Sequence, residues 1–443
     1  MTTLDRTLGL RSVVLFGLAY MTPLIVLGIF GITADATGGA SAGAYAVALV
    51  AMLFTAYSYG QMSRAFPVSG SAYTYVRRSI SDHLGFLVGW AVLLDYLFLP
   101  MVIWLIGGAY LQAQWPAVPF WLWIIAFIIL TTILNILGIK VADKTNYALM
   151  AFQVLVLVFF IILSITFILG GHGAGTLVSF EPLYAKASSW GALTAGAAIS
   201  AYSFLGFDAV TTLTEETIDA EHTIPRAIMY VALIGGGIFI LTAYVTTLAH
   251  PGTAFHDVSS ASFEIATEIG GAFFSSVFLA GLVIAQFASG IAAQASASRL
   301  IYAMGRDGVL PKRVFDKLSD AYRTPVPSIL AVAIVGLLAL RLDVATSTSF
   351  INFGAFTAFT MVNVSVIAHY LRHRASTDMN VIGWVAVPVV GALIDAYLLL
   401  QLDINAKRLG LIWLSIGILV LFGITKGFRV RPPQMEDALE ALV

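Results

Sequence analysis

The stretch Gly-Leu-Ala-Tyr-Met-Thr-Pro-Leu-Ile-Val-Leu-Gly (Gly17–Gly28) places a proline inside the first long apolar run of the chain. Pro23 removes a helix hydrogen bond, and its ring clashes with the carbonyl four residues earlier, so a continuous helix is not expected here. A second run, Ser-Ala-Tyr-Ser-Phe-Leu-Gly-Phe-Asp (Ser200–Asp208), sets Gly206 beside a carboxylate in otherwise apolar sequence. We therefore predict that two apolar helices are interrupted.

The composition places these runs in a membrane. Hydrophobic residues make up 59% and charged residues 11% of the 443 residues, against roughly 45–50% and about 25% in soluble domains. A soluble fold of this composition would expose large apolar patches. The absence of cysteine excludes disulfides, iron–sulfur clusters and thiolate metal sites.

Twelve apolar runs approach the length of about 20 residues that an α-helical membrane span requires. The run that ends at Arg341 is the weakest, because it is short. No cleavage site stands out after the first run, which indicates an uncleaved span in place of a signal peptide. The runs cover residues 12–34, 41–63, 84–111, 118–139, 146–170, 191–214, 226–249, 271–298, 327–342, 347–371, 381–401 and 409–427.

The two interruptions lie five spans apart, in the first and sixth runs. This pattern is typical of an inverted five-plus-five repeat whose broken helices meet at a midplane substrate site. The chain would then form one transmembrane domain, with repeats over residues 12–170 and 191–371 and peripheral helices over residues 381–427. Glycines that merely allow close helix packing are the alternative explanation.

The positive charges predict the orientation. With twelve spans, 19 of the 23 lysine and arginine residues fall on the side of the termini. Because positive residues are enriched in cytoplasmic loops, we expect a multi-pass cell-membrane protein with both termini in the cytoplasm. The exceptions are Lys186, Arg341, Lys407 and Arg408.

Three groups of motifs resemble those of amino acid–polyamine–organocation (APC) permeases. In order, they are Phe66–Tyr75 with Gly85 and Gly89-Trp90; Ser203–Val210 with Glu215-Glu216 and Ile224-Pro225-Arg226; and Ser298–Gly308 with Leu310-Pro311 and Thr324-Pro325. Within the family, Leu94–Pro100 and Gly206–Thr217 are most similar to bacterial putrescine importers. The resemblance covers nearly the whole chain. It implies the all-α leucine-transporter (LeuT) fold, with ten core helices in two inverted repeats plus two peripheral helices, and alternating-access uptake driven by protons or membrane potential.

Asp95 lies near the middle of the third span, where a charge costs at least ~2.5–3.5 kcal/mol. The resemblance implies that Asp95 faces inward towards a lysine on the fifth helix, but Gln153 stands where that lysine would be. A buried carboxylate without a cationic partner should take up a proton or bind a cation. We predict that Asp95 binds the substrate ammonium or carries the coupling proton; a protonated Asp95 bonded to hydroxyls is the alternative.

Four further acidic residues have weaker assignments. Asp208 acts as a gate or helix-stabilising carboxylate, or contacts the amine directly. One of Glu215 and Glu216 holds or releases a second ammonium; pairing with Arg226 or another cytoplasmic arginine at the membrane surface is the alternative. Asp395 lies outside the core repeat, and we interpret it as structural.

Aromatic residues flank the interruptions and Asp95, where an ammonium over a ring gains ~0.5–2 kcal/mol. Tyr202 matches a stacking or gating position of related antiporters, whereas Tyr96 belongs either to the site or to a packing stripe. The predicted substrate-binding residues are Tyr20, Thr22, Asp95, Tyr96, Tyr202, Ser203, Gly206, Phe207 and Asp208, and the predicted gating or coupling residues are Asp95, Glu215 and Glu216.

The first interruption favours an amine without a carboxylate. Amino-acid permeases of this family place Gly-Ser-Gly or Gly-Ala-Gly here, so that free amides receive the substrate carboxylate. The present stretch, Ala19–Pro23, is bulky and includes a proline without an N–H. We therefore predict an importer of a small cationic amine such as putrescine; a general or cationic amino-acid permease is the alternative.

The sequence lacks the motifs that are typical of other classes of function. The remote alternative is a membrane-embedded enzyme. The sequence lacks the motifs that would support it: His-Glu-x-x-His, a pair of aspartates at the spacing of metal ligands, and Gly-x-Ser-x-Gly. No charge ring or filter repeat indicates a channel. We expect no cofactor, metal or nucleic-acid partner, and the eighth span offers sodium mainly Ser289, which favours proton or potential drive. The sequence leaves the exact substrate, the coupling ion and the oligomeric state open.

Overall fold

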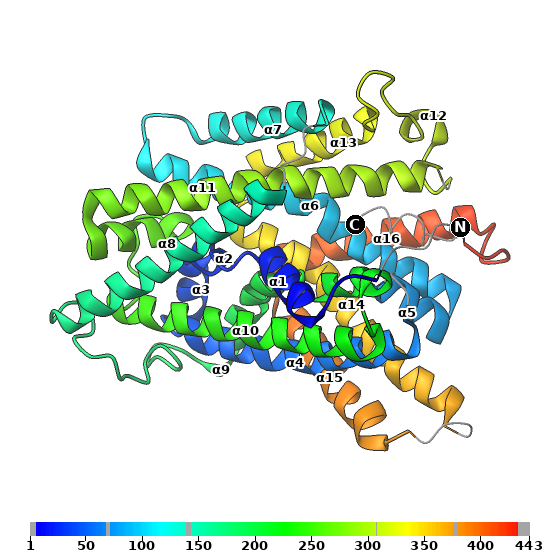
Figure 1. Cartoon of the computed structure of the whole chain (residues 1–443), viewed down its shortest axis with the longest axis horizontal. Coiled ribbons are helices and arrows are strands. Elements are labelled where there is room, and N and C mark those ends of the chain that lie inside the picture. Colours follow the sequence, from blue (N-terminus) through cyan, green and yellow to red (C-terminus); the bar gives the residue numbers. More distant parts are fainter. Residues whose placement is uncertain (1–5, 68–70, 139–142, 307, 375–378, 433–443) are drawn as a thin grey trace.

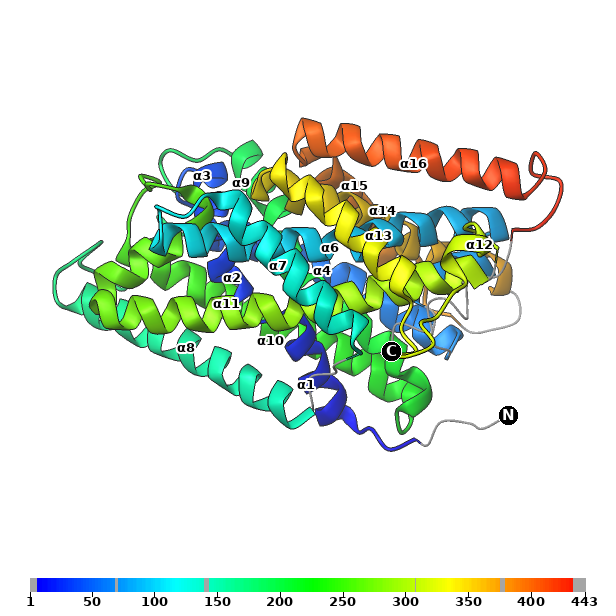
Figure 2. The ribbon, with the colours of Figure 1, turned by 90° about the horizontal axis from the view of Figure 1, so that it is seen from above.

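The computed structural model describes residues 6–432 apart from 68–70, 139–142, 307 and 375–378. The side chains of Ser71, residues 143–147, Glu215 and Ala303 also lie outside the described part. Within that part the chain forms a bundle of helices without strands (Figures 1 and 2). The elements are α1 (Leu10–Met21), α2 (Ile25–Gly28), α3 (Phe30–Thr37), α4 (Ser41–Ala65), α5 (Ser71–Ser79), α6 (Asp82–Gln114), α7 (Phe120–Ile136), α8 (Asp143–Leu169), α9 (Trp190–Ser200), η1 (Ala201–Phe204), η2 (Phe207–Glu216), α10 (Ala220–Ala249), η3 (Val258–Ser260), α11 (Ala261–Arg306), α12 (Lys312–Phe315), α13 (Val326–Gly336), η4 (Leu337–Leu340), α14 (Val344–His373), η5 (Ile382–Ala386), α15 (Val387–Gln401) and α16 (Ile404–Ile424).

All twelve predicted spans are helical. Ten stretches among the described residues are long and apolar enough to cross a membrane. The other two, α7 and α13 with η4, are shorter apolar helices at the fourth and ninth predicted positions. The chain is therefore an all-α multi-pass membrane protein, as its composition predicts.

The first span is broken where Pro23 predicts. Helix α1 ends at Met21, and Thr22 takes a left-handed backbone conformation with φ 52°. Its amide donates to the carbonyl of Ala19 at 3.2 Å, and the helix resumes at Ile25. A further irregularity at Ile29, with φ −121° and ψ 11°, separates α2 from α3.

The sixth span is broken at Gly206, as predicted. Gly206 has φ 101°, a conformation that residues with a Cβ rarely adopt. Beyond it, η2 continues as a 3₁₀ helix for ten residues, although such runs rarely exceed three or four. The hydroxyls of Thr211 and Thr212 donate to the carbonyls of Asp208 and Ala209 at 2.7 and 2.6 Å, which satisfies backbone groups along this tight helix.

The two broken spans lie together. Helix α1 packs against η2 and α10, and Figure 1 shows α1 between α11 and α10. The amides of Thr7 and Leu8 donate to the carbonyl of Glu216 at 2.9 and 3.0 Å, and the amide of Ile218 donates to Leu8 at 2.9 Å. The chain before the first span is thus attached to the end of the sixth.

The eighth span departs from the prediction, which starts it at residue 271. Helix α11 begins at Ala261 and turns at Gly271, whose φ is 66°. The sequence hides this first segment because Glu264 and Glu268 lower its apolar character. Glu264 accepts the amide of His256 at 3.0 Å, so the segment closes the preceding loop.

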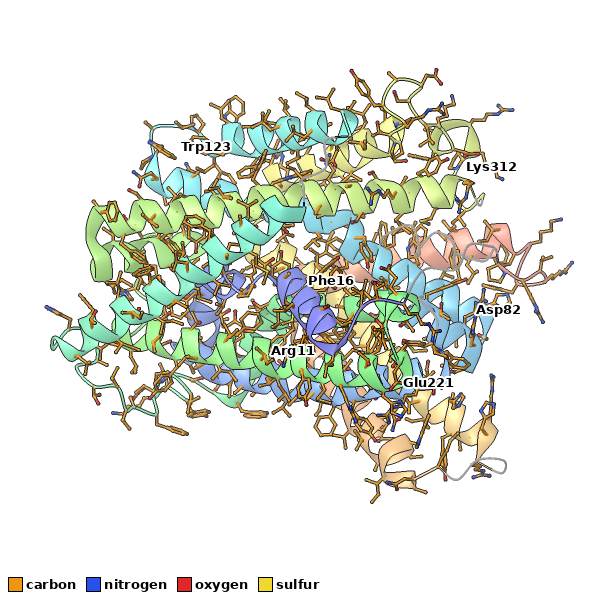
Figure 3. All side chains as sticks on the ribbon, in the orientation of Figure 1. Arg11, Phe16, Asp82, Trp123, Glu221 and Lys312 are labelled. Carbon is orange, nitrogen blue, oxygen red and sulfur yellow. The ribbon has the colours of Figure 1, made fainter. Side chains whose placement is uncertain are left out.

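Charged residues mark one end of the bundle. Figure 3 shows Asp82, Glu221 and Lys312 towards the same end, whereas Trp123 lies in the opposite half. Asp82, Glu221 and Lys312 lie at or near the N-terminal ends of α6, α10 and α12. We refer to this end as the Lys312 end.

Candidate functional site

The ring of Tyr20 lies directly on the backbone of Gly206. A Cβ atom at position 206 would stand 2.1 Å from Cδ1 of Tyr20 and 2.8 Å from its Cε1. Glycine therefore serves two purposes at this break: it permits the left-handed conformation, and it leaves room for the ring. The contact joins the last turn of α1 to the interruption of the sixth span.

Two carboxylates lie beside this contact. Asp95 on α6 and Asp208 on η2 are close enough to influence each other electrostatically, and both influence Tyr20. The hydroxyl of Tyr96 neighbours that of Tyr20, and Tyr202 lies within electrostatic range of Asp95. The structure thus brings five of the predicted residues together, and we call them the amine cluster: Tyr20, Asp95, Tyr96, Tyr202 and Asp208.

The amine cluster has an unused acceptor and an open side. Oδ1 of Asp95 is buried and has no hydrogen-bond partner among the described residues. Burial of such an atom is costly unless a proton or a cation satisfies it. Tyr20 keeps 42% of its surface exposed, whereas Tyr202 keeps 5%. Tyr20 is therefore on the less enclosed side of the cluster.

Asp208 is held from the opposite side by α4. The hydroxyl of Tyr59 donates to its Oδ2 at 3.3 Å. The ring of Tyr59 meets Phe207 and Phe359 edge-on, at centroid distances of 5.8 and 6.1 Å. Phe207 is fully buried in this aromatic group, so its environment is one of packing, although the sequence places it among the substrate-binding residues.

The remaining predicted residues of the sixth span are also tied to neighbouring helices. Ser203 is buried and shares a hydrogen bond of 3.0 Å with the hydroxyl of Tyr45 on α4. Just before the break, the side-chain amide of Asn352 on α14 donates to the carbonyl of Ala198 at 2.7 Å. Carbonyls at the end of an interrupted helix need such partners, because the next turn does not supply them.

Three contributors escaped the sequence analysis: Tyr45, Tyr59 and Asn352. An asparagine at membrane depth is a signal in its own right, since polar groups there are expensive and commonly functional. The tyrosines carried no comparable signal, because the chain contains 17 of them. Only their partners on the sixth span reveal their part in the site.

The first break presents few free amides. The amides of Thr22 and Ile25 donate to the carbonyls of Ala19 and Thr22, and Pro23 has no N–H. The hydroxyl of Thr22, half-buried, makes only a long contact of 3.5 Å with the carbonyl of Tyr20. The amides of Leu24 and Val26 donate to no described acceptor, so a ligand would find these two amides, and none at Pro23, at this position.

The other sequence-predicted groups lie apart from the amine cluster. Neither Glu216 nor Arg226 forms an ion pair with any side chain that the structure describes, and the side chain of Glu215 lies outside the described part. Gln153 sits on α8, which packs chiefly against α10 and α11. No described contact joins these residues to Asp95.

Asp395 belongs to a separate buried network. The hydroxyl of Thr55 donates to its Oδ2 at 2.6 Å, and Nδ2 of Asn363 donates to the same atom at 3.0 Å. Ser58 in turn donates to Asn363 Oδ1 at 2.6 Å. The network joins α4, α14 and α15, which agrees with a structural role for Asp395.

Comparison with known proteins indicates the family to which the chain belongs. A family model described as "Amino acid permease" matches residues 12–402. The chain is 41% identical over 437 residues to the low-affinity putrescine importer PlaP of Escherichia coli (strain K12), covering 98% of this chain and 97% of PlaP. It is 26% identical to the branched-chain amino acid permease BcaP of Bacillus subtilis (strain 168), covering 95% and 93% of the two chains. It is also 27% identical to human cationic amino acid transporter 4, covering 85% of this chain and 60% of that protein.

Proposed function

Because this chain belongs to the amino acid permease family, we propose that it is a secondary importer of a small cationic amine, putrescine or a similar diamine. The protein is a transporter and not an enzyme, and it works by alternating access driven by protons or membrane potential. Identity of 41% with a putrescine importer, over nearly the full length of both proteins, supports this substrate class.

The position of Asp95 carries the proposal: its Oδ1 is buried without a described partner, and it lies beside Asp208 and the two broken spans. A substrate ammonium supplies the donor and the charge that this atom lacks. Asp208 provides a second carboxylate in the same cluster. One ammonium therefore binds Asp95 and the other Asp208, with Tyr20, Tyr96 and Tyr202 around the alkyl chain.

The first break favours a diamine over an amino acid. With Pro23 lacking an N–H and the amides of Thr22 and Ile25 occupied, a substrate carboxylate would find only the amides of Leu24 and Val26 as donors at the break. A general or cationic amino-acid permease is the competing function, since a branched-chain amino acid permease and a cationic amino acid transporter are 26% and 27% identical to this chain over the aligned residues.

The orientation and repeat structure complete the proposal. Residues 12–170 and 191–371 form the two inverted repeats, and residues 381–427 add the peripheral helices. The Lys312 end and both termini face the cytoplasm of a cell-membrane protein. Glu215 and Glu216, at the end of η2, take part in releasing the amine on that side.

A binding panel tests the substrate class. We expect purified protein to bind putrescine more tightly than ornithine, and more tightly than a monoamine of matching length. Equal affinity for ornithine would show that a carboxylate is tolerated and would favour the amino-acid permease. In Asp208→Asn the advantage of putrescine over the monoamine should disappear, because the second carboxylate contact is lost.

Asp95→Asn tests the observation that carries the proposal. It keeps the size of the side chain and removes its charge, so putrescine affinity should fall by at least ~1–2 kcal/mol, about tenfold. Asp395→Asn is the matched control: it removes another buried carboxylate at membrane depth, outside the amine cluster, and should leave the affinity unchanged. Equal effects of the two variants, or no effect of Asp95→Asn on affinity and pH dependence, would refute the assignment.

A further inference from the structure

A cavity of about 460 Å³ lies between α7, α11 and α13, outside the amine cluster. None of its lining residues belongs to α1, α6 or η2. Figures 1 and 2 show α7 and α13 on the side of α11 away from α1. The cavity also contains part of the third sequence motif, Arg299 and Thr324-Pro325, which the proposed transport function does not use.

The cavity is positively charged at one end. Among the described residues, it is lined by Arg299 near the end of α11 and Arg323 just before α13, and by no aspartate or glutamate. Neither arginine forms a hydrogen bond or ion pair with a side chain that the structure describes. The backbone of Arg323 is left-handed, with φ 55°, and its amide donates to the carbonyl of Ser319 at 2.9 Å. Two unpaired guanidinium groups in one cavity indicate an anionic ligand.

Three neutral polar groups of the cavity are already engaged. The hydroxyl of Ser298 donates to Ala295, and that of Thr324 donates to Ile136, both at 2.8 Å. The side-chain amide of Asn135 donates to Gln294 at 3.0 Å. The two arginines, with the hydroxyls of Ser296 and Tyr322, therefore remain as donors for a ligand. The N-terminus of α13 lies beside them, and its dipole also favours negative charge.

The other end of the cavity is apolar. There it is lined by Ala288, Ile291 and Ala292 on α11 and by Ile329 on α13. Helix α11 is regular between Ala288 and Arg299, so at 1.5 Å per residue the change from apolar to cationic takes place over about 16 Å. The hydrocarbon part of one membrane leaflet is about 15 Å deep, half of the bilayer core.

We propose that this cavity binds an anionic phospholipid from the leaflet at the Lys312 end. The phosphodiester contacts Arg299 and Arg323, and an acyl chain or the glycerol backbone occupies the space beside Ala288, Ala292 and Ile329. Basic pockets between membrane helices bind acidic lipid headgroups in this way. A soluble phosphate would use only the cationic end and leave the apolar half without a partner.

The test uses the full chain in a neutral detergent, with phosphatidylglycerol, phosphatidylcholine and inorganic phosphate as separate additives. Native mass spectrometry measures bound lipid, and thermal unfolding measures stabilisation. We expect phosphatidylglycerol to bind and stabilise, and the other two additives to do neither. Arg299→Gln with Arg323→Gln should weaken phosphatidylglycerol binding about twenty-five-fold, since each arginine near a membrane surface contributes about fivefold.

Two further variants separate the outcomes. Lys312→Gln with Arg313→Gln removes two exposed charges at the same end but outside the cavity, and should leave phosphatidylglycerol binding unchanged. Ala292→Phe fills the apolar half and keeps both arginines, so it tests the site if the arginine variant does not fold. It should reduce lipid binding. If inorganic phosphate stabilises the protein and still does so in Ala292→Phe, the cavity is a soluble-anion site and the proposal is overturned. The proposal is also overturned if the Lys312/Arg313 variant loses as much phosphatidylglycerol binding as the Arg299/Arg323 variant.

Discussion

The contact between Tyr20 and Gly206 predicts the effect of a single methyl group. In Gly206→Ala the new Cβ stands 2.1 Å from Cδ1 of Tyr20, which is 1.3 Å less than the 3.4 Å at which ordinary contact begins. Overpacking of this kind costs about 1–3 kcal/mol. The φ of 101° adds about 1–2 kcal/mol for a residue with a Cβ. We therefore expect the free energy of unfolding to fall by roughly 2–5 kcal/mol.

A double-mutant cycle separates the two contributions. In a Tyr20→Ala background the steric contribution is absent, so Gly206→Ala should cost only the backbone contribution of about 1–2 kcal/mol. Reversible unfolding in mixed micelles measures all four proteins. Gly237→Ala on α10 is the control, because nothing lies within 4 Å of its new Cβ, and alanine favours a helix interior by up to about 1 kcal/mol. The same loss in both backgrounds would show that the ring does not rest on Gly206.

The buried network and the coupling ion provide two further predictions. Thr55→Val removes the 2.6 Å hydrogen bond to Asp395 and should lower the free energy of unfolding by about 1–3 kcal/mol. Thr242→Val should cost nothing, because the hydroxyl of Thr242 is buried without a partner among the described residues; a similar loss in both variants would exclude a specific role for the Thr55 bond. Uptake into proteoliposomes should persist when choline replaces sodium at constant pH, because Ser289 is the main hydroxyl that the middle of α11 offers to sodium; a collapse of uptake would establish sodium coupling.

The sequence alone determined the features that depend on a few neighbouring residues. Hydropathy located all twelve helices, because each span must be apolar along its own length. Pro23 located the first break, because a missing N–H and a ring clash act within one turn. Gly206 beside Asp208 located the second, and a charge at membrane depth singled out Asp95. Matching motifs over nearly the whole chain indicated the family.

The tertiary structure decided which of these features meet. Asp208 is held by Tyr59, 149 positions away in the chain, and the ring of Tyr20 rests on Gly206 from another span. Phe207 and Ser203 contact Tyr59 and Tyr45 on α4. Such contacts arise from the packing of one helix against another. No local pattern encodes them, since many residues of the same type occur in equivalent local sequence, and only the fold selects the pairs that touch.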